Sequence, residues 1–188
     1  MWHNEINDCL NILKSGGVIL YPTDTVWGIG CDATNASAVE KIFKIKNRPE
    51  SKSLITLVND DRMLMRYVRD VPEVAWELIE TSEKPITIIY DGILGLAQNV
   101  LAEDKSAAIR ICRDEFCRNL IQRFGKPIIS TSANISGEAT PQYFKEIDPA
   151  LFSSVDYIVK WRQGEFTQNM PSSIIRLKLN GEFKIIRK

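Results

Sequence analysis

Three polar segments hold the side chains of this 188-residue chain that are best suited to chemistry. The first is Tyr-Pro-Thr-Asp-Thr-Val-Trp-Gly-Ile-Gly over residues 21–30, where a short apolar run stops at Pro22. Thr23, Asp24 and Thr25 offer two hydroxyls and a carboxylate, which can hold a small polar ligand. The same residues also suit a tight turn in which they accept hydrogen bonds from backbone amides. Taken alone, the segment leaves both interpretations open.

The second segment is Lys46-Asn47-Arg48-Pro49, followed by Lys52. It belongs to a stretch, residues 41–52, in which five cations face Glu50 alone, a local net charge of +4. Such a stretch can be a solvated helix end, where cations suit the helix dipole. It can also be an anion clamp, because Arg binds phosphate or carboxylate with a planar fork and Lys adds a mobile charge. Pro49 would then turn the chain out of the helix and toward a cleft.

The third segment is Ser-Thr-Ser-Ala-Asn over residues 130–134, which continues into Ser136-Gly137 and Thr140-Pro141. It follows a predicted buried strand, and open α/β sheets build their sites at strand ends. Small hydroxyls and an amide in that position can contact phosphate oxygens. An ordinary polar loop has the same composition, so this segment too is weak evidence by itself.

The inventory of residue types excludes several kinds of chemistry. His3 is the only histidine, which rules out Ser–His and Cys–His nucleophiles and histidine-based metal sites. Of the four cysteines only Cys112 and Cys117 are close in sequence, at a spacing that is not typical of zinc. We therefore expect reduced, buried thiols that serve packing. Chemistry would rest on Lys, Arg, Ser, Thr, Asn and carboxylates.

Alternating patterns predict the scaffold that positions these segments. Apolar residues at helical spacing predict a first helix that ends at Gly16-Gly17. Ser37 and Glu40 form a capping-box pattern, which predicts a second helix as far as Lys46. Further helices are expected over residues 60–69, 72–81 and 114–124, the last one capped by Gly125.

Short apolar runs predict the strands, over residues 18–21, 54–58, 86–90, 107–112, 128–131 and 155–159. Near the end of the chain, residues 174–179 and 183–186 flank Asn180-Gly181, which predicts a hairpin with a type I′ turn. Helices that alternate with strands, together with a hairpin, predict an α/β fold with a mixed sheet.

Length and composition predict one globular domain over residues 1–188. Hydrophobic residues make up 44% of the chain and charged residues 26%, which is ordinary for a globular protein. The 24 Lys and Arg residues balance the 24 Asp and Glu residues, so bulk charge does not favour a nucleic-acid partner. The sequence has neither an apolar run of about 18 residues nor the pattern of a secretory signal at its start. We therefore expect no membrane contact and a cytoplasmic location.

Taken together and in order, Tyr-Pro-Thr-Asp-Thr-x-x-Gly, Lys-x-Arg-Pro and Ser-x-Asn-x-Ser-Gly resemble the motifs of the YrdC-like family. Members of that family are L-threonylcarbamoyladenylate synthases, and the resemblance runs from Gly16 to Arg187. It implies a twisted mixed parallel/antiparallel sheet flanked by helices, around a large concave basic cavity. It also implies that L-threonine, bicarbonate and ATP, with Mg²⁺ on the ATP, give threonylcarbamoyl-AMP and pyrophosphate. The product serves t6A formation at adenosine 37 of tRNAs that read ANN codons.

The resemblance also assigns roles to residues by their place in the motifs. Lys46 and Arg48 match the Lys-x-Arg pair and are expected to be catalytic. ATP-binding positions are expected at Arg48, Lys52, Ser106, Ser132, Asn134, Thr140 and Arg187. Threonine-binding positions are expected at Thr25, Arg110, Ser130 and Ser172. No metal site made of protein side chains is implied.

Two other functions stay open at the level of sequence. The same cavity would suit an RNA-binding module, although zero net charge and the lack of a basic stripe with interleaved aromatics argue against tight binding. A domain that adenylates a carbamoyl group for another acceptor would carry similar motifs, but such domains belong to much longer chains. Under the main hypothesis the product passes to proteins of a t6A transferase complex, and weak tRNA binding is compatible with that role.

Overall fold

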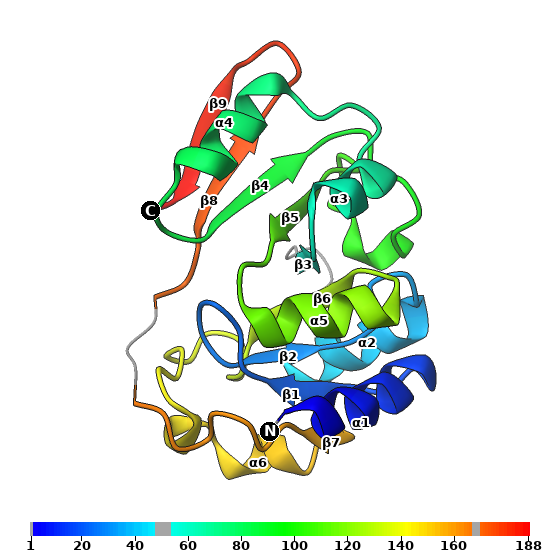
Figure 1. Ribbon diagram of the computed structural model, residues 1–188, viewed down its shortest axis with the longest axis vertical. Coiled ribbons are helices and arrows are strands. Elements are labelled where there is room, and N and C mark those ends of the chain that lie inside the picture. The colour runs from blue at the N-terminus through cyan, green and yellow to red at the C-terminus, as the bar shows by residue number, and fades with distance from the viewer. Residues whose placement is uncertain (1, 48–53, 167–169) are drawn as a thin grey trace.

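The computed structural model describes residues 2–47, 54–166 and 170–188 (Figure 1). Within these residues nine strands form one sheet, in the order β7-β1-β2-β6-β3-β5-β4-β8-β9. Most neighbouring strands therefore come from distant parts of the sequence. This order allows polar segments that lie far apart along the chain to meet in space.

The strands are short, and three of the pairings between them are parallel. Their bounds are β1 Ile19–Tyr21, β2 Gly28–Gly30, β3 Ile55–Val58, β4 Ile86–Tyr90, β5 Ala107–Ile111, β6 Ile128–Ser132, β7 Tyr157–Ile158, β8 Ser173–Leu177 and β9 Phe183–Arg187. The pairs β1–β7, β3–β5 and β4–β8 are parallel, and the other neighbours are antiparallel. The predicted α/β fold with a mixed sheet is confirmed.

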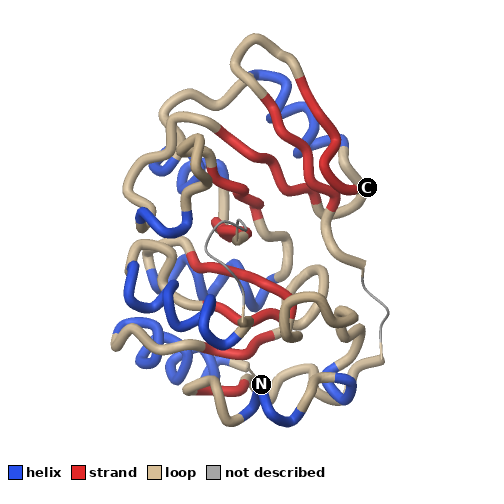
Figure 2. The backbone as a smooth tube through the Cα atoms, turned by 180° about the vertical axis from the view of Figure 1, so that it is seen from behind, coloured by secondary structure: helices blue, strands red, loops and turns tan. Residues whose placement is uncertain are grey.

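Helices pack along the length of this sheet, on its middle strands as well as its outer ones (Figure 1). They are α1 His3–Lys14, α2 Ala36–Ile45, α3 Asp61–Tyr67, α4 Glu73–Thr81, α5 Glu115–Phe124 and α6 Pro149–Phe152, with 3₁₀ turns η1 Gln98–Val100 and η2 Phe144–Glu146. Helices α1 and α5 pack together, and the rings of Trp2 and Phe116 meet edge to face at 6.0 Å. Figure 2 shows the opposite side of the molecule, with β8 and β9 in front of α4.

The ends of the helices follow local capping chemistry, with one correction. Helix α5 ends at Gly125, whose φ of 76° confirms the expected glycine cap. The prediction that Ser37 caps α2 was wrong. The side chain of Asn35 accepts a hydrogen bond from Ala38 N at 3.2 Å, so the helix begins at Ala36. Asparagine and serine are both good caps, and here the residue two positions earlier takes the role.

The hairpin of β8 and β9 is present, but its turn is not of type I′. A type I′ turn needs positive φ at both central residues. Asn180 is not among the residues with positive φ, whereas Gly181 has a φ of 85°. Gly181 N donates to Lys178 O at 3.0 Å and Lys178 N donates to Glu182 O at 2.9 Å. This is a three-residue loop, a type I turn followed by a glycine bulge.

The core confirms the expectation for the cysteines. All four, Cys9, Cys31, Cys112 and Cys117, are free and buried. Burial is the main cause that raises the pKa of Cys9 to about 12, so this thiol stays protonated at neutral pH. The Cys117 thiol donates to Pro22 O at 3.2 Å and so joins α5 to the loop after β1.

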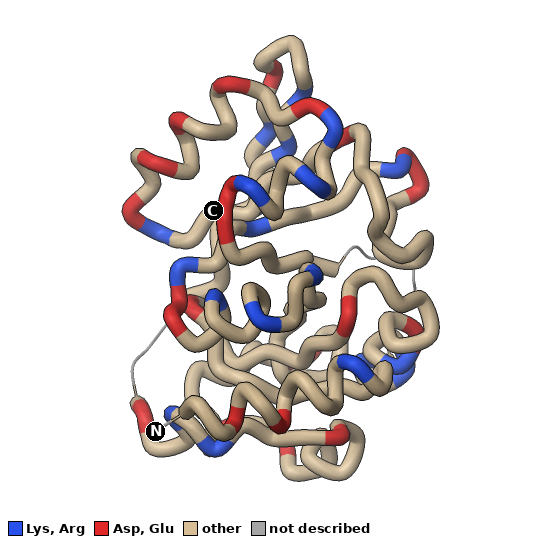
Figure 3. Tube along the Cα trace, turned by 45° about the vertical axis from the view of Figure 1, so that its right-hand side comes forward, with Lys and Arg blue, Asp and Glu red and all other residues tan. Residues whose placement is uncertain are grey.

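Lys and Arg residues are interspersed with Asp and Glu residues along the described chain (Figure 3). Two cations of the basic stretch over residues 41–52 have structural roles: Lys41 donates to Gly16 O at 2.8 Å, and exposed Lys44 pairs with Glu40. In the part of the chain that the structure describes, none of the helices is long and apolar enough to cross a membrane.

Candidate active site

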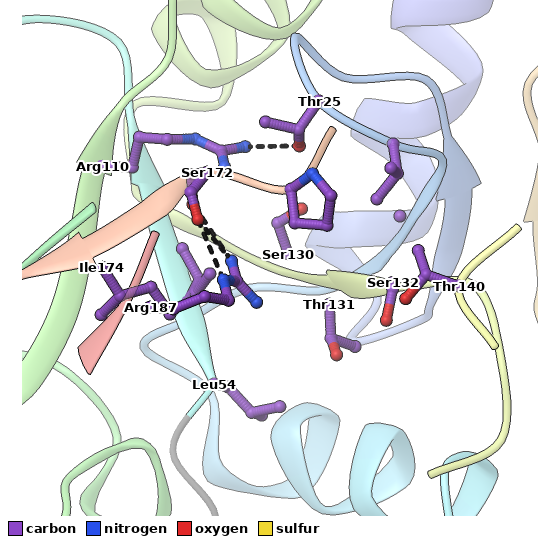
Figure 4. A pocket seen from close by; sticks show the side chains of 14 residues that line it. Thr25, Leu54, Arg110, Ser130, Thr131, Ser132, Thr140, Ser172, Ile174 and Arg187 are labelled. Carbon is purple, nitrogen blue, oxygen red and sulfur yellow. Dashed lines mark hydrogen bonds between the residues drawn. The ribbon is translucent and has the colours of Figure 1, made fainter. Parts of the chain in front are cut away.

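A cavity of about 150 Å³ opens between the β2–β6 part of the sheet and the β8–β9 hairpin (Figure 4). Its polar lining consists of Thr25, Arg110, Ser130, Thr131, Ser132, Thr140, Ser172 and Arg187. Apolar contacts come from Val26, Leu54, Ile55, Pro171 and Ile174, and Gly28 completes the lining. The described lining thus contains two arginines and no carboxylate, which suits an anionic ligand.

The sheet register explains why these residues meet. Gly28 of β2 pairs with Ser132 of β6, and Ser130 of the same strand pairs with Ile55 of β3. Strand β3 runs parallel to β5, where Arg110 lies one residue before the strand ends. Polar side chains at adjoining strand ends therefore face one space. Gly28 is constrained by this contact, because a Cβ there would lie 2.9 Å from Ser130 Oγ.

The two threonines of the first motif have different roles. Thr23 closes a turn: its Oγ1 accepts from Thr25 N at 3.0 Å and donates to Val26 O at 2.7 Å. Thr25 lines the cavity, where its Oγ1 accepts a hydrogen bond from Arg110 Nη2 at 3.3 Å. The structure thus shows the turn at Thr23 and places the Thr25 hydroxyl, two residues later, at the cavity.

Arg110 is the most deeply buried cation of the lining, with 3% of its side chain exposed. Its Nη2 lies 2.9 Å from Asp24 Oδ1, in an ion pair that is not aligned as a hydrogen bond. Its Nε is buried and has no hydrogen-bond partner. Arg110 therefore brings a deeply buried positive charge to a described lining that holds no carboxylate, which favours an anionic ligand.

Arg187 is held against the opposite wall of the cavity. Its Nε and Nη2 donate to Ser172 O at 3.0 and 2.7 Å. The Ser172 hydroxyl in turn shares a 2.7 Å hydrogen bond with Thr87 on β4. Burial, and after it the charge of Arg110, lower the pKa of Arg187. Two guanidinium groups thus share one cavity, and an anion between them would relieve their repulsion.

Lys46 joins the second and third motifs from behind the cavity. Its Nζ donates to Ser132 O at 2.6 Å and to Asn134 Oδ1 at 3.0 Å, and the residue is 1% exposed. The Asn134 amide donates to Glu138 O at 2.7 Å, which fixes the loop that leads to Thr140. The lysine therefore holds the Ser-x-Asn loop in shape and does not itself line the cavity.

Comparison with known proteins identifies the family. A family model that covers Sua5, YciO and YrdC proteins, described as "Telomere recombination", matches residues 11–188. A protein of Pseudoalteromonas translucida (strain TAC 125) named threonylcarbamoyl-AMP synthase is 32% identical over 182 residues, 95% of this chain and 96% of its own. The chain belongs to the Sua5/YciO/YrdC family.

Solved structures of this family share the fold. E. coli YciO superposes with a TM-score of 0.84 at 26% identity, over 98% of this chain and 89% of its own. P. abyssi Sua5 superposes with a TM-score of 0.83 at 25% identity, over 92% of this chain. The chain spans about half of Sua5, 52% of its length. A second P. abyssi Sua5 structure, complexed with L-threonine, gives a TM-score of 0.81 at 24% identity, over 92% of this chain and 51% of its own.

The structure brings together most of the residues that the Sua5/YciO/YrdC motifs pointed to. Seven of them line the cavity: Thr25, Arg110, Ser130, Ser132, Thr140, Ser172 and Arg187. Lys46 and Asn134 lie directly behind it. Arg48 and Lys52 lie outside the described residues. Ser106 is not part of the lining, and its hydroxyl donates to Asp104 at 2.6 Å.

Two features of this family site were not expected from the sequence. Asp24, left open as a turn residue, pairs with Arg110. The Arg113 guanidinium donates to Ile79 O and Ser82 O at the end of α4, and Arg113 N donates to Asp24. The only signal in the sequence was that Arg110 and Arg113 lie three residues apart. The fold was needed to show that the Arg110 guanidinium and the Arg113 backbone N both contact Asp24. Within the described ranges, no three His, Cys, Asp or Glu side chains are grouped so that they could hold a metal ion.

Proposed function

We propose that this chain is an L-threonylcarbamoyl-AMP synthase, which converts L-threonine, bicarbonate and ATP to threonylcarbamoyl-AMP and pyrophosphate. The observation that carries the proposal is the cavity that both Arg110 and Arg187 line, beside the motif hydroxyls. Threonine carries a carboxylate and ATP a triphosphate, so two cations in one cavity match these two of the three substrates. Identity of 32% to a named threonylcarbamoyl-AMP synthase along 95% of the chain supports the same reaction.

Arg110 is the proposed partner of the threonine carboxylate. It lines the cavity, and a planar guanidinium can bind a carboxylate through two parallel hydrogen bonds. Thr25, Ser130 and Ser172 surround it with hydroxyls that can accept from or donate to the rest of the amino acid. This placement leaves the threonine amine directed into the cavity, where it must react.

Arg187 is the proposed contact for the nucleotide phosphates, with Ser132 and Thr140 on the facing loop. The described lining offers neutral hydroxyl oxygens and cations but no carboxylate. It therefore suits Mg²⁺ that is bound to the ATP phosphates better than Mg²⁺ that is held by protein carboxylates. Mg²⁺ would supply charge neutralisation on the triphosphate. Arg48, Lys52 and Ser106 remain assigned to ATP by their motif positions alone.

The chemistry requires no covalent enzyme intermediate. The threonine amine forms a carbamate with carbon dioxide from bicarbonate and loses a proton. A carbamate oxygen then attacks the α-phosphorus of ATP, and the bond to the departing pyrophosphate breaks. The cavity would act by holding the carbamate and the phosphate at short range and by stabilising negative charge. Lys46 contributes by fixing the Ser132–Asn134 loop.

The test is pyrophosphate release by the purified chain with Mg-ATP, with L-threonine and bicarbonate each present or omitted. We expect release that depends on both. Release that ignores threonine would point to a different acceptor for the adenylate. ATP binding without release, together with tight and steeply salt-dependent tRNA binding, would favour the RNA-binding alternative. Under the proposal, the product passes to a t6A transferase, and addition of that enzyme and tRNA should yield t6A.

A further inference from the structure

Asp24 connects three segments beside the cavity. Its Oδ1 lies 2.9 Å from Arg110 Nη2, and its Oδ2 accepts a hydrogen bond from the backbone N of Arg113 at 3.1 Å. The exposed fractions of the two side chains are 9% for Asp24 and 3% for Arg110. The loop after β1 is thus tied to the end of β5 through both a side chain and the backbone. Removing one partner of a pair this buried leaves the other charge uncompensated.

Arg110 lines the cavity, whereas its ion-pair partner Asp24 does not. Nη2 of Arg110 donates to Thr25 Oγ1, and its contact with Asp24 is not aligned as a hydrogen bond. Asp24 therefore compensates the charge of the guanidinium from outside the cavity. If the Asp24 carboxylate instead accepted two parallel hydrogen bonds from Arg110, it would compete with the substrate carboxylate for the same guanidinium.

The position of Asp24 is itself anchored. Asp24 accepts a hydrogen bond from the backbone N–H of Arg113. The Arg113 guanidinium in turn donates to Ser82 O at 2.7 Å and to Ile79 O at 2.5 Å. These carbonyls end α4, where a cation suits the helix dipole. Asp24 does not line the cavity, so it has no direct contact with a ligand there.

We infer that Asp24 is a positioning residue for substrate binding. It holds the Arg110 guanidinium in the orientation in which it receives the carboxylate of the amino-acid substrate. This inference rests on the proposed function, because it names the work of Arg110 in that reaction. Its effect acts through Arg110 and is specific to the substrate that carries the carboxylate.

The test measures KM for threonine, KM for ATP and kcat of threonine-dependent pyrophosphate release in Asp24→Asn. Asparagine keeps the shape and an oxygen for Arg113 N, but loses the charge. We expect KM for threonine to rise about tenfold or more, with KM for ATP within about twofold of wild type. Asp24→Glu, which keeps the charge, should recover most of the lost threonine affinity.

A matched control is Asp32→Asn. Asp32 is also a buried acid, with 6% of its side chain exposed and 2.9 Å from Lys126 Nζ, but it is not part of the cavity lining. This variant should melt at a lower temperature and keep the wild-type KM for threonine. If it raised that KM as much as Asp24→Asn does, the effect would be one of general stability, and the inference would be wrong.

The outcomes separate the inference from the proposed function. A wild-type chain without threonine-dependent release overturns the proposed function and this role with it. A wild type that releases pyrophosphate, beside an Asp24→Asn enzyme with unchanged KM for threonine, overturns the inference alone. If Asp24→Asn fails to fold, the Asp24→Glu variant decides. A KM for threonine near the wild-type value in that variant supports a role based on charge. A tenfold higher KM for threonine contradicts it.

Discussion

Lys46 Nζ donates a 2.6 Å hydrogen bond to Ser132 O, although the two residues are 86 positions apart in the chain. The lysine at the end of α2 and the loop after β6 are therefore one structural unit. A buried ammonium with oxygen partners from that loop fixes the direction of the loop. Lys46 of the second motif and the Ser-x-Asn loop are thus bound to each other.

The first prediction concerns this contact. Lys46→Met keeps the bulk of the side chain but removes the charged donor from Ser132 O and Asn134 Oδ1, which retain the hydrogen bonds from Asn134 N and Ser132 Oγ. We expect pyrophosphate release to fall about 100-fold. We also expect a lower melting temperature, because loss of hydrogen bonds from a charged donor costs about 1.5–3 kcal/mol. Lys44→Met is the control, since Lys44 is 74% exposed. Equal release by wild type and Lys46→Met would remove Lys46 from the mechanism.

The second prediction separates the two ends of the cavity. Arg187→Gln removes the cation beside Ser172 and should raise KM for ATP about 10- to 100-fold, with KM for threonine nearly unchanged. Lys184→Gln, on the same strand but paired opposite Arg176, should leave both constants as they are. Steady-state kinetics with each substrate varied in turn would decide the matter. A larger effect on threonine than on ATP would reverse the assignment.

The third prediction tests the tight contact at Gly28. In Gly28→Ala the new methyl group would lie 2.9 Å from Ser130 Oγ, so the hydroxyl must move within the cavity. We expect a loss of about 1–3 kcal/mol in the free energy of unfolding, and reduced turnover. Gly164→Ala is the matched control, because no atom lies within 4 Å of a Cβ there. Denaturant unfolding and kinetics on both variants provide the measurement.

The fourth prediction is a dependence of stability on pH. Hydrogen bonds from Ser106, and then from Arg176, lower the pKa of Asp104 from 3.8 to about 2. The folded chain therefore favours the ionised carboxylate, so this stabilisation is present above pH 3.8 and is lost as the pH falls toward 2. Ser106→Ala should lower the melting temperature at neutral pH by an amount that shrinks over this range.

The control for that titration is Ser154→Ala, which removes an exposed hydroxyl that donates to the backbone oxygen of Ala150. Its effect on the melting temperature should stay constant between pH 4 and pH 2, because no carboxylate takes part. Thermal melts of wild type and both variants at a series of pH values give the comparison. A Ser106→Ala effect as constant as that of Ser154→Ala would contradict the role given to Asp104.

The sequence predicted those parts of the fold that depend on local chemistry. Apolar runs located the strands other than β2, which lies in a glycine-containing segment read as a loop or irregular strand, and Gly125 located the end of α5. Where two local solutions were equally good, the sequence could not choose: Asn35 caps α2 in place of Ser37, because Asn35 N also closes a turn onto Asp32 O at 3.2 Å. The hairpin turn depends on register, since pairing of Leu177 with Phe183 leaves room for the extra bulge residue.

The site was predictable only in part, for a related reason. Thr25, Ser130 and Ser132 lie at strand ends with polar composition, which is a local signal. Arg187 lies on a strand whose residues are all exposed, and nothing near it in sequence indicates that it faces Ser172. The resemblance to a family supplied that residue. Asp24 and Arg113 needed the three-dimensional arrangement, because their contact joins segments 89 positions apart.

Strand β9 has a neighbour on one side only, and all of its residues are exposed. Strands of this kind open locally more often than interior strands such as β5. Arg187, the proposed nucleotide contact, therefore lies on an edge strand that is prone to fraying, while Arg110 lies on an interior strand between β3 and β4. Bound ATP would hold β9 closed, and amide hydrogen exchange along that strand would slow on nucleotide addition. The apparent affinity for ATP would thus be lowered by the free energy needed to keep β9 paired. The apparent affinity for threonine would not include this cost.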